Sequence, residues 1–340
     1  MIHSNQTTLG RRAILGAAAM ALAAPALAQT ATAWPDRPIT LVVPFLAGGS
    51  TDIAARILAD RMPPLLGPRA RIIVENRAGA GGSVGADFAR RQAPDGYTLL
   101  LGTASSHGTN PVTLQDTTRY DPITDFTPIA LVGGGPLVVV VPRNSPFRTI
   151  EDLVADMRAR PNALHWGTSG TGNIGHLTGA MVLASAPGGG APLEAEHVSY
   201  RGGSQVMEAM AKGELNFSLE PMASAAPHLR DDVSRGLAVT SRERSPLFPD
   251  MPSLLERGFV DFDSTTWNVL VGPRGMPPEI TAALNRATLT VLADPAVRSR
   301  LSIAGVDAAP PMTPDQTRDF LVAELAKFRA IVARGGLTFN

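Results

Sequence analysis

The sequence has no cysteine, only two lysines and few aromatic residues, which make up 5% of it. Without cysteine there can be no disulfide, no thiolate nucleophile and no cysteine-ligated metal. Lys plus Arg and Asp plus Glu each number 30, so the balanced charge gives no electrostatic reason to expect binding to nucleic acid or to an anionic membrane. With 44% hydrophobic and 18% charged residues in 340, the composition is that of an ordinary globular chain of about two domains.

Motifs for catalysis and metal binding are also missing. The six histidines form no metal-binding spacing, and no phosphate-binding loop surrounds either lysine. Gly167-x-Ser169 resembles a nucleophile elbow, but Thr171 stands where that motif requires glycine. The sequence therefore predicts no metal, no cofactor and no catalytic residue.

The N-terminus has the pattern of an export signal. Arg11-Arg12 precedes an apolar run from Ala13 to Ala24, and Ala26-Leu27-Ala28 is a small-x-small cleavage site. We expect a signal peptide at 1–28, with Ala31-Thr32-Ala33 as a second possible cleavage site. The twin arginines favour the twin-arginine export route, and a general secretory signal is the alternative. Either route predicts a periplasmic protein of a Gram-negative bacterium.

The most informative stretch runs from Ile39 to Arg56. A buried strand, Ile39–Val43, is followed by the glycine turn Ala47-Gly48-Gly49 and then by a helix. Ser50 or Thr51 is expected to cap this helix, and Asp52 falls in its first turn. Because the unpaired N–H groups of a helix N-terminus point into such a turn, the stretch predicts an anion-binding site.

Strands and helices alternate along the rest of the chain, and Thr149 with Asp152 and Thr313 with Gln316 form capping boxes that predict two of the helix starts. The segment 39–103 predicts a mostly parallel sheet covered on both faces, with ligand-binding turns at the carboxyl ends of its strands. A polar loop is expected at 105–126, and then two strands, Pro128–Val132 and Leu137–Val141, joined by a loop at 133–136. The chain returns near Thr265, so two α/β lobes are predicted, lobe 1 at 34–135 and 263–340 and lobe 2 at 136–262, with a hinge and a cleft between them.

A second glycine turn, Thr168–Asn173, lies between a strand and a helix of lobe 2 and leads into His176. If the lobes close face to face, two helix N-termini hold one carboxylate with backbone donors alone. The alternative is an exported α/β enzyme, because Gly170-x-Gly172-x-x-Gly175 fits the dinucleotide fingerprint. However, no acidic residue stands at the end of the next strand, at Tyr200, where a ribose would need one.

Four separated motifs resemble one family. They are Pro44–Asp52 with Arg56, Glu75–Gly82 with Ala78 where proline is usual, Pro94–Leu100, and Tyr200–Gly203. These motifs are similar to those of the Bug family, the periplasmic solute-binding proteins of tripartite tricarboxylate transporters. The resemblance implies a type II periplasmic binding protein fold, a small carboxylate ligand and membrane transporter subunits as partners. It further implies that the ligand contacts the residues matching the family's turns, namely Ala47, Gly48, Gly49, Ser50, Thr51 and Asp52, with Thr168, Ser169, Gly172 and Asn173 from lobe 2.

Other candidates follow strands at the same edge. Ser105, with Ser106 and His107, follows the third strand, and His176 and Tyr200 border turns of lobe 2. Glu220 stands where the family commonly has aspartate. If it faces the cleft it favours an amino or hydroxyl group on the ligand and disfavours a second carboxylate nearby, and its alternative role is to cap a helix. Trp267 faces either the cleft or the packed hinge.

These features together predict a monomeric extracytoplasmic solute-binding protein that captures a small carboxylate by hinge closure. It would deliver the ligand to a tripartite tricarboxylate transporter or serve as the input of a sensor.

The N-terminal pattern generates one prediction. Mass spectrometry of the exported protein should find a mature chain that begins after Ala28. A chain that retains Met1 would contradict the prediction of a signal peptide.

Overall fold

The computed structural model describes residues 1–2, 34–260, 262–335 and 339. Nearly all of the predicted signal peptide, with its twin arginines and both cleavage sites, lies outside these residues. Contacts divide the chain into two compact units, Met1–Trp34 and Pro35–Asn340, and every strand and helix of the described residues belongs to the second unit.

Ten strands of the described residues form one continuous sheet. In spatial order its main path is β2 (Ile72–Asn76), β1 (Ile39–Val43), β3 (Thr98–Thr103), β9 (Thr265–Pro273), β4 (Phe126–Pro142), β7 (Phe217–Pro221), β5 (His165–Thr168) and β6 (Glu196–Ser199). Two further strands, β8 (Ser234–Val239) and β10 (Asp307–Ala308), pair with β4. The strands β1, β2 and β3 are parallel, as are β5, β6 and β7, whereas β4 and β9 run antiparallel to their neighbours.

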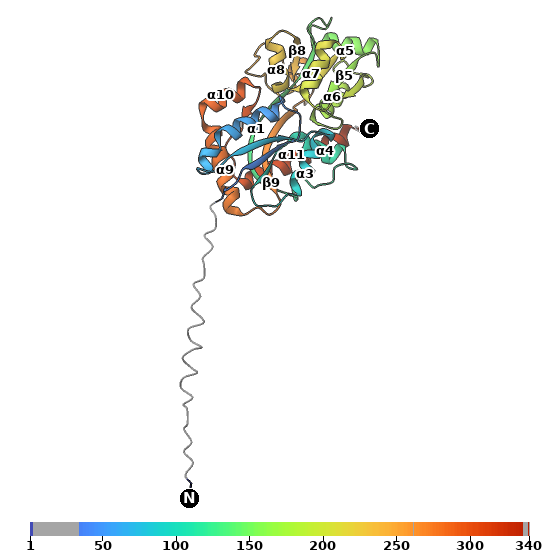
Figure 1. Ribbon diagram of the computed structural model, residues 1–340. Coiled ribbons are helices and arrows are strands. Elements are labelled where there is room, and N and C mark those ends of the chain that lie inside the picture. Colours follow the sequence, from blue (N-terminus) through green and yellow to red (C-terminus); the bar gives the residue numbers. More distant parts are fainter. Residues whose placement is uncertain (3–33, 261, 336–338, 340) are drawn as a thin grey trace. The chain divides into compact units, whose positions relative to one another are not determined.

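Helices pack against this sheet on both sides of β4. In Figure 1, α5 to α8 gather at one end, whereas α3, α9 and α11 lie at the other. The α-helices are α1 (Ser50–Arg61), α2 (Pro63–Leu66), α3 (Ser83–Arg90), α4 (Asn110–Thr113), α5 (Ile150–Ala159), α6 (Ile174–Ser185), α7 (Gly203–Lys212), α8 (Met222–Arg230), α9 (Pro278–Ala293), α10 (Pro295–Ile303) and α11 (Pro314–Gly335). Short turns of other helix types are η1 (Ala80–Gly82), η2 (Ser105–Thr109) and η3 (Leu255–Arg257).

The central strand β4 differs from its prediction. The expected loop at 133–136 is absent, and one strand of 17 residues runs from Phe126 to Pro142. Its first part pairs with β9 and β10 and its last part with β7 and β8. The change of partners falls near Pro136, where the sequence predicts the border between lobes. The glycines of this segment, which predict a loop in the sequence, instead allow two strands to approach closely. A Cβ on Gly134 would overlap the carbonyl oxygen of Thr266 and lie 2.9 Å from Trp267 Cα.

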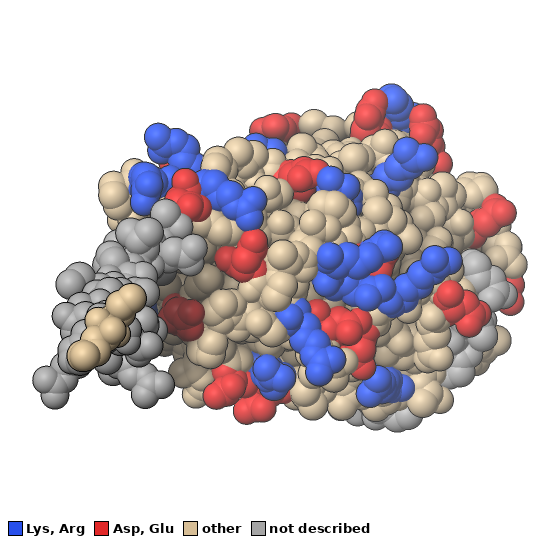
Figure 2. Space-filling model, turned by 60° about the horizontal axis from the view of Figure 1, so that its bottom comes forward, with Lys and Arg blue, Asp and Glu red and all other residues tan. Residues whose placement is uncertain are grey.

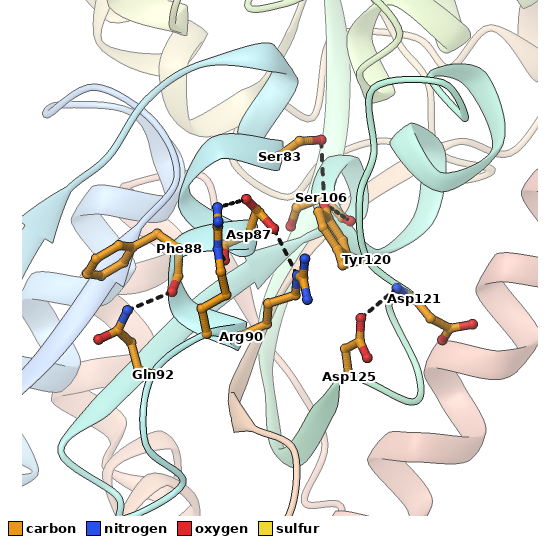
Figure 3. Close-up of polar contacts among 10 residues, drawn as sticks. Ser83, Asp87, Phe88, Arg90, Gln92, Ser106, Tyr120, Asp121 and Asp125 are labelled. Carbon is orange, nitrogen blue, oxygen red and sulfur yellow. Dashed lines mark hydrogen bonds and ion pairs between the residues drawn. The ribbon is translucent and has the colours of Figure 1, made fainter.

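The predicted loop at 105–126 is also partly helical. A single π-helical turn, η2, follows β3 directly and leads into α4. Tyr120, from the irregular stretch beyond α4, donates a hydrogen bond of 2.7 Å to the carbonyl of Ser106, and Figure 3 shows it between Ser106 and Ser83. His107 is fully buried in η2 and packs on Phe126. Tertiary packing therefore orders a stretch whose sequence shows no periodicity.

The capping boxes predicted at two helix starts are confirmed. Thr149 and Asp152 form a capping box at α5, and Thr313 and Gln316 exchange the same pair of hydrogen bonds at α11. The expectation for α1 was wrong in one respect. Its N-cap is Gly49, and neither Ser50 nor Thr51 donates or accepts a capping hydrogen bond.

The hydrophobic core continues across the predicted border between lobes. One cluster joins Val42, Leu100 and Trp267 of the first part to Ile174 and Leu177 of α6. A separate cluster around Trp166, Phe217 and Phe259 belongs to the second part alone. Both parts are thus packed together in this structure at the start of α6.

The surface matches the balanced composition. On the face that Figure 2 shows, acidic and basic side chains are interspersed. In the part of the chain that the structure describes, no helix combines the length and apolar character needed to cross a membrane.

The close contact at Gly134 generates a stability prediction. Gly134→Ala forces a methyl group against the fixed backbone of β9, so we expect it to lower the free energy of unfolding by about 1–3 kcal/mol. Gly236→Ala in β8 is the matched control, because its methyl group meets the flexible end of Met251 instead. Urea unfolding of both variants measures the difference, and equal losses would contradict the packing explanation.

Candidate functional site

The carboxyl ends of β1, β3, β5 and β7 converge on one cavity between the two parts of the sheet. About 430 Å³ in it and at its mouth is not filled by atoms, and the centre of a water molecule can move through about 30 Å³ of this space. Side chains and turns from both parts line it, namely Phe45, Leu46, Gly49, Ser50, Thr51, Thr103, Ser105, Ser169, Ile174, Gly203, Glu220, Pro221, Ser224 and Thr266. Six of the predicted site residues are thereby brought together: Gly49, Ser50, Thr51, Ser105, Ser169 and Glu220.

The N-terminus of α1 forms one wall. Its first helical hydrogen bond runs from the Ile53 N–H to the carbonyl of Gly49, so the amides of the preceding turn have no partner within the helix. Among the described residues no side chain caps this end. Ser50 and Thr51 line the cavity, and the positive end of the helix dipole therefore faces its space. This geometry suits a carboxylate.

Asp52 holds the turn from behind. The carboxylate is 3% exposed and accepts hydrogen bonds from the Gly48 N–H at 3.0 Å, from Arg56 Nε at 2.8 Å and Nη2 at 3.0 Å, and from Asn76 Nδ2 at 3.0 Å. Burial acts to raise the pKa of Asp52, but the hydrogen bonds from Arg56, Gly48 and Asn76 outweigh it and keep the pKa below its usual value. Asp52 does not line the cavity, so the geometry gives it a positioning role, and direct contact with a ligand stays a prediction.

Hydroxyl groups cover much of the remaining wall. Thr103, Ser169, Ser224 and Thr266 line the cavity from four different elements. Ser105 in η2 also reaches across to the second part, where its Oγ accepts the N–H of Ile174 at 3.2 Å. That hydrogen bond engages an N–H group at the start of α6, so the Ser105 hydroxyl both lines the cavity and joins the two parts.

The second glycine turn holds its own structure together. Asn173 caps α6 by accepting the His176 N–H at 2.8 Å, and its Nδ2 donates to the Ser169 hydroxyl. Gly172 donates its N–H to His176 Nδ1, and its carbonyl accepts from Thr113 at 2.7 Å. Thr168, Gly172, Asn173 and His176 therefore lie around the cavity wall without lining it, and their contact with a ligand stays a prediction.

His176 belongs to a stacked pair of histidines. Its ring lies 3.7 Å from that of His197, centroid to centroid, and His197 shares a hydrogen bond of 2.8 Å with Thr168. Burial, together with the neighbouring His197, lowers the pKa of His176 to about 3, and burial lowers that of His197 to about 4. Both rings are therefore uncharged at neutral pH and contribute no cation to the cavity.

Glu220 stands at the end of β7 with its side chain 1% exposed. Oε1 accepts the N–H of Ser169 at 2.9 Å, whereas Oε2 has no hydrogen-bond partner among the described residues. Burial raises the pKa of Glu220 to about 8, although the hydrogen bonds from Ser169 act in the opposite direction.

The remaining predicted residues lie outside this cavity. Tyr200 lines a neighbouring hollow of about 310 Å³ between the two parts, together with Phe45 and Ser169, which border both spaces. Ala47 and Gly48 are exposed at the tip of the first turn. Trp267 is 4% exposed and donates from Nε1 to Glu324 in α11 at 2.8 Å, so it packs against that helix rather than lining the cavity.

Several lining residues were not predicted. Thr103, Gly203 and Ser224 follow or end strands at the same sheet edge, so the rule that ligands bind there could have found them. Thr266 lies near the start of an antiparallel strand, and no sequence signal indicates it. In the described part of the chain, no group of three or more His, Cys, Asp or Glu side chains is placed to hold a metal ion.

The glycines of the dinucleotide-like motif have packing roles. A Cβ on Gly170 would lie 2.9 Å from Gly81 Cα, and one on Gly175 would lie 2.7 Å from the carbonyl of Leu219. Gly172 is covered by Leu114 and Thr113. Close approach of chain segments thus explains all three glycines without a phosphate.

Comparisons with known proteins agree with this geometry. The family described as tripartite tricarboxylate transporter family receptor, TctC, matches residues 54–337. Protein BugT of Bordetella pertussis is 33% identical over 316 residues, which cover 93% of each chain. Two solved structures resemble this one: R. palustris Rpa4515 with adipate has a TM-score of 0.84, 30% identity and coverage of 90% of this chain and 99% of that one. The periplasmic binding protein BugD has a TM-score of 0.82, 28% identity and the same coverage values.

The predicted family and fold class are confirmed by these matches. The chain has the two-lobed α/β fold of periplasmic binding proteins and belongs to the Bug-type receptor family of tripartite tricarboxylate transporters.

Proposed function

We propose that this protein is a periplasmic solute-binding receptor that captures a small carboxylate in the cavity between its lobes and presents it to a tripartite tricarboxylate transporter. The observation that carries the proposal is the uncapped N-terminus of α1, whose first residues line the cavity. Its amides offer a carboxylate several hydrogen bonds and a favourable helix dipole. The family match and the adipate named for the Rpa4515 structure support the same class of ligand.

The site is built to bind rather than to react. Among the described residues that line the cavity wall there is no Lys, Arg or His, and Glu220 is the one ionisable group. The glycines that resemble an enzyme's dinucleotide motif are accounted for by packing. We therefore assign no catalytic residue to the cavity.

Hinge closure is the mechanism we propose. We take lobe 1 as 34–135 and 263–340 and lobe 2 as 136–262, so the chain passes between them once within β4 and once just before β9. The lobes touch at the cavity through Ser105 and Ile174, and beside it through Thr113 and Gly172. A ligand that bridges the two walls would stabilise this closed arrangement by the difference between its affinities for the closed and open states.

Export and partners belong to the same proposal. A signal peptide at 1–28 would place the mature protein in the periplasm, where it would act as a monomer and meet the membrane subunits of the transporter. A receptor that feeds a sensor instead would bind its ligand in the same way.

The first prediction concerns backbone access at the turn. Gly48 has a φ of +85° and Gly275 one of +86°, and a Cβ on either would meet nothing within 4 Å. Valine should strain both turns equally, but Gly48→Val alone should abolish the rise in Tm that adipate or another bound carboxylate produces. We expect Gly275→Val to keep that rise. If both variants keep it in a screen of dicarboxylates, tricarboxylates, aromatic acids and amino acids, the site lies elsewhere.

A second prediction concerns the support of the turn. Asp52→Ala removes the acceptor of the Gly48 N–H, the partner of Arg56 and one of the two acceptors of the Asn76 amide, so we expect a loss of about 1–3 kcal/mol in the free energy of unfolding. The ligand-induced rise in Tm should also disappear. Asp156→Ala is the control, because it removes the same i,i+4 pairing with arginine on the surface of α5.

Acid titration tests the same carboxylate. Because the pKa of Asp52 is lower in the folded state, its contribution to stability is present above the ordinary aspartate pKa of 3.8 and is lost as the pH falls. The difference in unfolding free energy between wild type and Asp52→Ala should therefore shrink in acid. A difference that stays constant down to the lowest pH at which the protein folds would argue against a lowered pKa.

A further inference from the structure

The free oxygen of Glu220 is the most unusual atom in the cavity wall. Oε2 is buried and lacks a partner among the described residues, whereas Oε1 is held by the Ser169 N–H. A buried carboxyl oxygen without a hydrogen bond is costly, so its place in a binding cavity calls for an occupant. Gly203 leaves room beside it, because a Cβ there would lie only 2.7 Å from Oε2.

Among the described residues, no charged group compensates an ionised Glu220. The strand opposite it, β4, has no ionisable residue, and Val138 is its partner across the ladder. The titratable groups on the other elements packed against β7 either pair with one another or lie at the far ends of their elements. They are His165 with Glu196, His176 with His197, Glu208 with Lys212, and His228 and Arg230 in the last turn of α8.

Without a nearby cation, ionisation of Glu220 would leave a bare charge in the protein interior. Protonation removes that charge, and burial correspondingly raises the pKa of the side chain to about 8. The neutral acid has one O–H to donate. Since Oε1 already accepts a hydrogen bond from Ser169, Oε2 is the atom free to donate.

We propose that Glu220 binds the ligand as an uncharged carboxylic acid, with its Oε2–H donating to a second carboxylate of the ligand across the cavity from α1. This inference rests on the proposed function, which places the first carboxylate at α1. It makes Glu220 a specificity-determining residue for dicarboxylates. It also reverses the expectation from the sequence that Glu220 would favour an amino or hydroxyl group and disfavour a second carboxylate, because an uncharged acid does not repel a carboxylate.

The proposal predicts a proton-linked affinity. Below the pKa of Glu220 the donor is present, and the dissociation constant of a dicarboxylate stays constant. Above it, each further pH unit requires the uptake of a proton to bind, so the dissociation constant rises about tenfold per unit. A ligand with an ammonium group should show the opposite preference, because it gains a partner only when Glu220 is ionised.

Matched ligands distinguish binding to an uncharged Glu220 from binding to an ionised Glu220. Adipate, 6-aminohexanoate and hexanoate share one chain length and differ at one end by a carboxylate, an ammonium or a methyl group. Succinate, 4-aminobutyrate and butyrate form a shorter set. Isothermal titration calorimetry from pH 6 to 9.5 should show that wild type prefers the dicarboxylate of whichever set fits.

Variants then assign the effect to this residue. Glu220→Gln keeps a neutral donor of similar shape, so we expect dicarboxylate affinity within about tenfold of wild type, a difference worth one hydrogen bond, and no decline above pH 8. Glu220→Ala should weaken binding further and reduce the preference over the monocarboxylate. Glu214→Gln, on the exposed end of the turn after α7, is the control and should behave as wild type. A preference for the amino acid that Glu220→Gln abolishes, or a pH dependence that survives in Glu220→Gln, would overturn the proposal.

A measurement without ligand keeps this test separate from the proposed function. Since the pKa of Glu220 is raised from 4.5 to about 8 in the folded state, the free energy of unfolding should fall as the pH rises between those values. Glu220→Gln should remove that slope, and a ¹³C-labelled glutamate carboxyl should titrate near pH 8 in wild type only. If no carboxylate binds wild type, the proposed function fails, and the titration still decides whether Glu220 is protonated. Titration of Glu220 at the ordinary glutamate pKa would overturn this inference alone.

Discussion

Four hydrogen bonds to the buried carboxylate of Asp52 organise the first turn, and the rest of the cavity depends on that turn. They join the Gly48 amide in the turn, Arg56 on the next turn of α1 and Asn76 at the end of β2. A negative charge in the first turn of a helix is favourable, so Asp52 also stabilises α1. Among the described residues no side chain caps the helix end that Asp52 supports, and Ser50 and Thr51 of this end line the cavity.

Glycines in this fold also let backbone segments approach one another closely. Gly134 permits β4 to pass close to β9, and Gly81 faces Gly170 where the predicted lobes meet. Binding walls on two separate strand–turn–helix units can therefore come within reach of one small molecule. The described residues that line the cavity are hydroxyl-bearing side chains, two glycines, the acid Glu220, and the apolar residues Phe45, Leu46, Ile174 and Pro221.

The sequence predicted most of the fold because its signals are local. The strand Ile39–Val43 and the capping boxes at Thr149 and Thr313 occur where they were expected. The errors arose where tertiary contacts overrule local preference. Gly133–Pro136 reads as a loop, but pairing with β9 and β10 extends it as strand, and the stretch after β3 becomes a π-helical turn because His107 is buried against Phe126.

The sequence by itself determined the α/β class, the family and the helix N-terminus of α1, because each depends on neighbouring residues in the chain. It could not determine which of the candidate residues share a cavity, because segments far apart in the chain supply the walls. Nor could it determine the state of Glu220, since only the folded chain surrounds this acid with apolar and uncharged groups and removes the water that would keep it ionised.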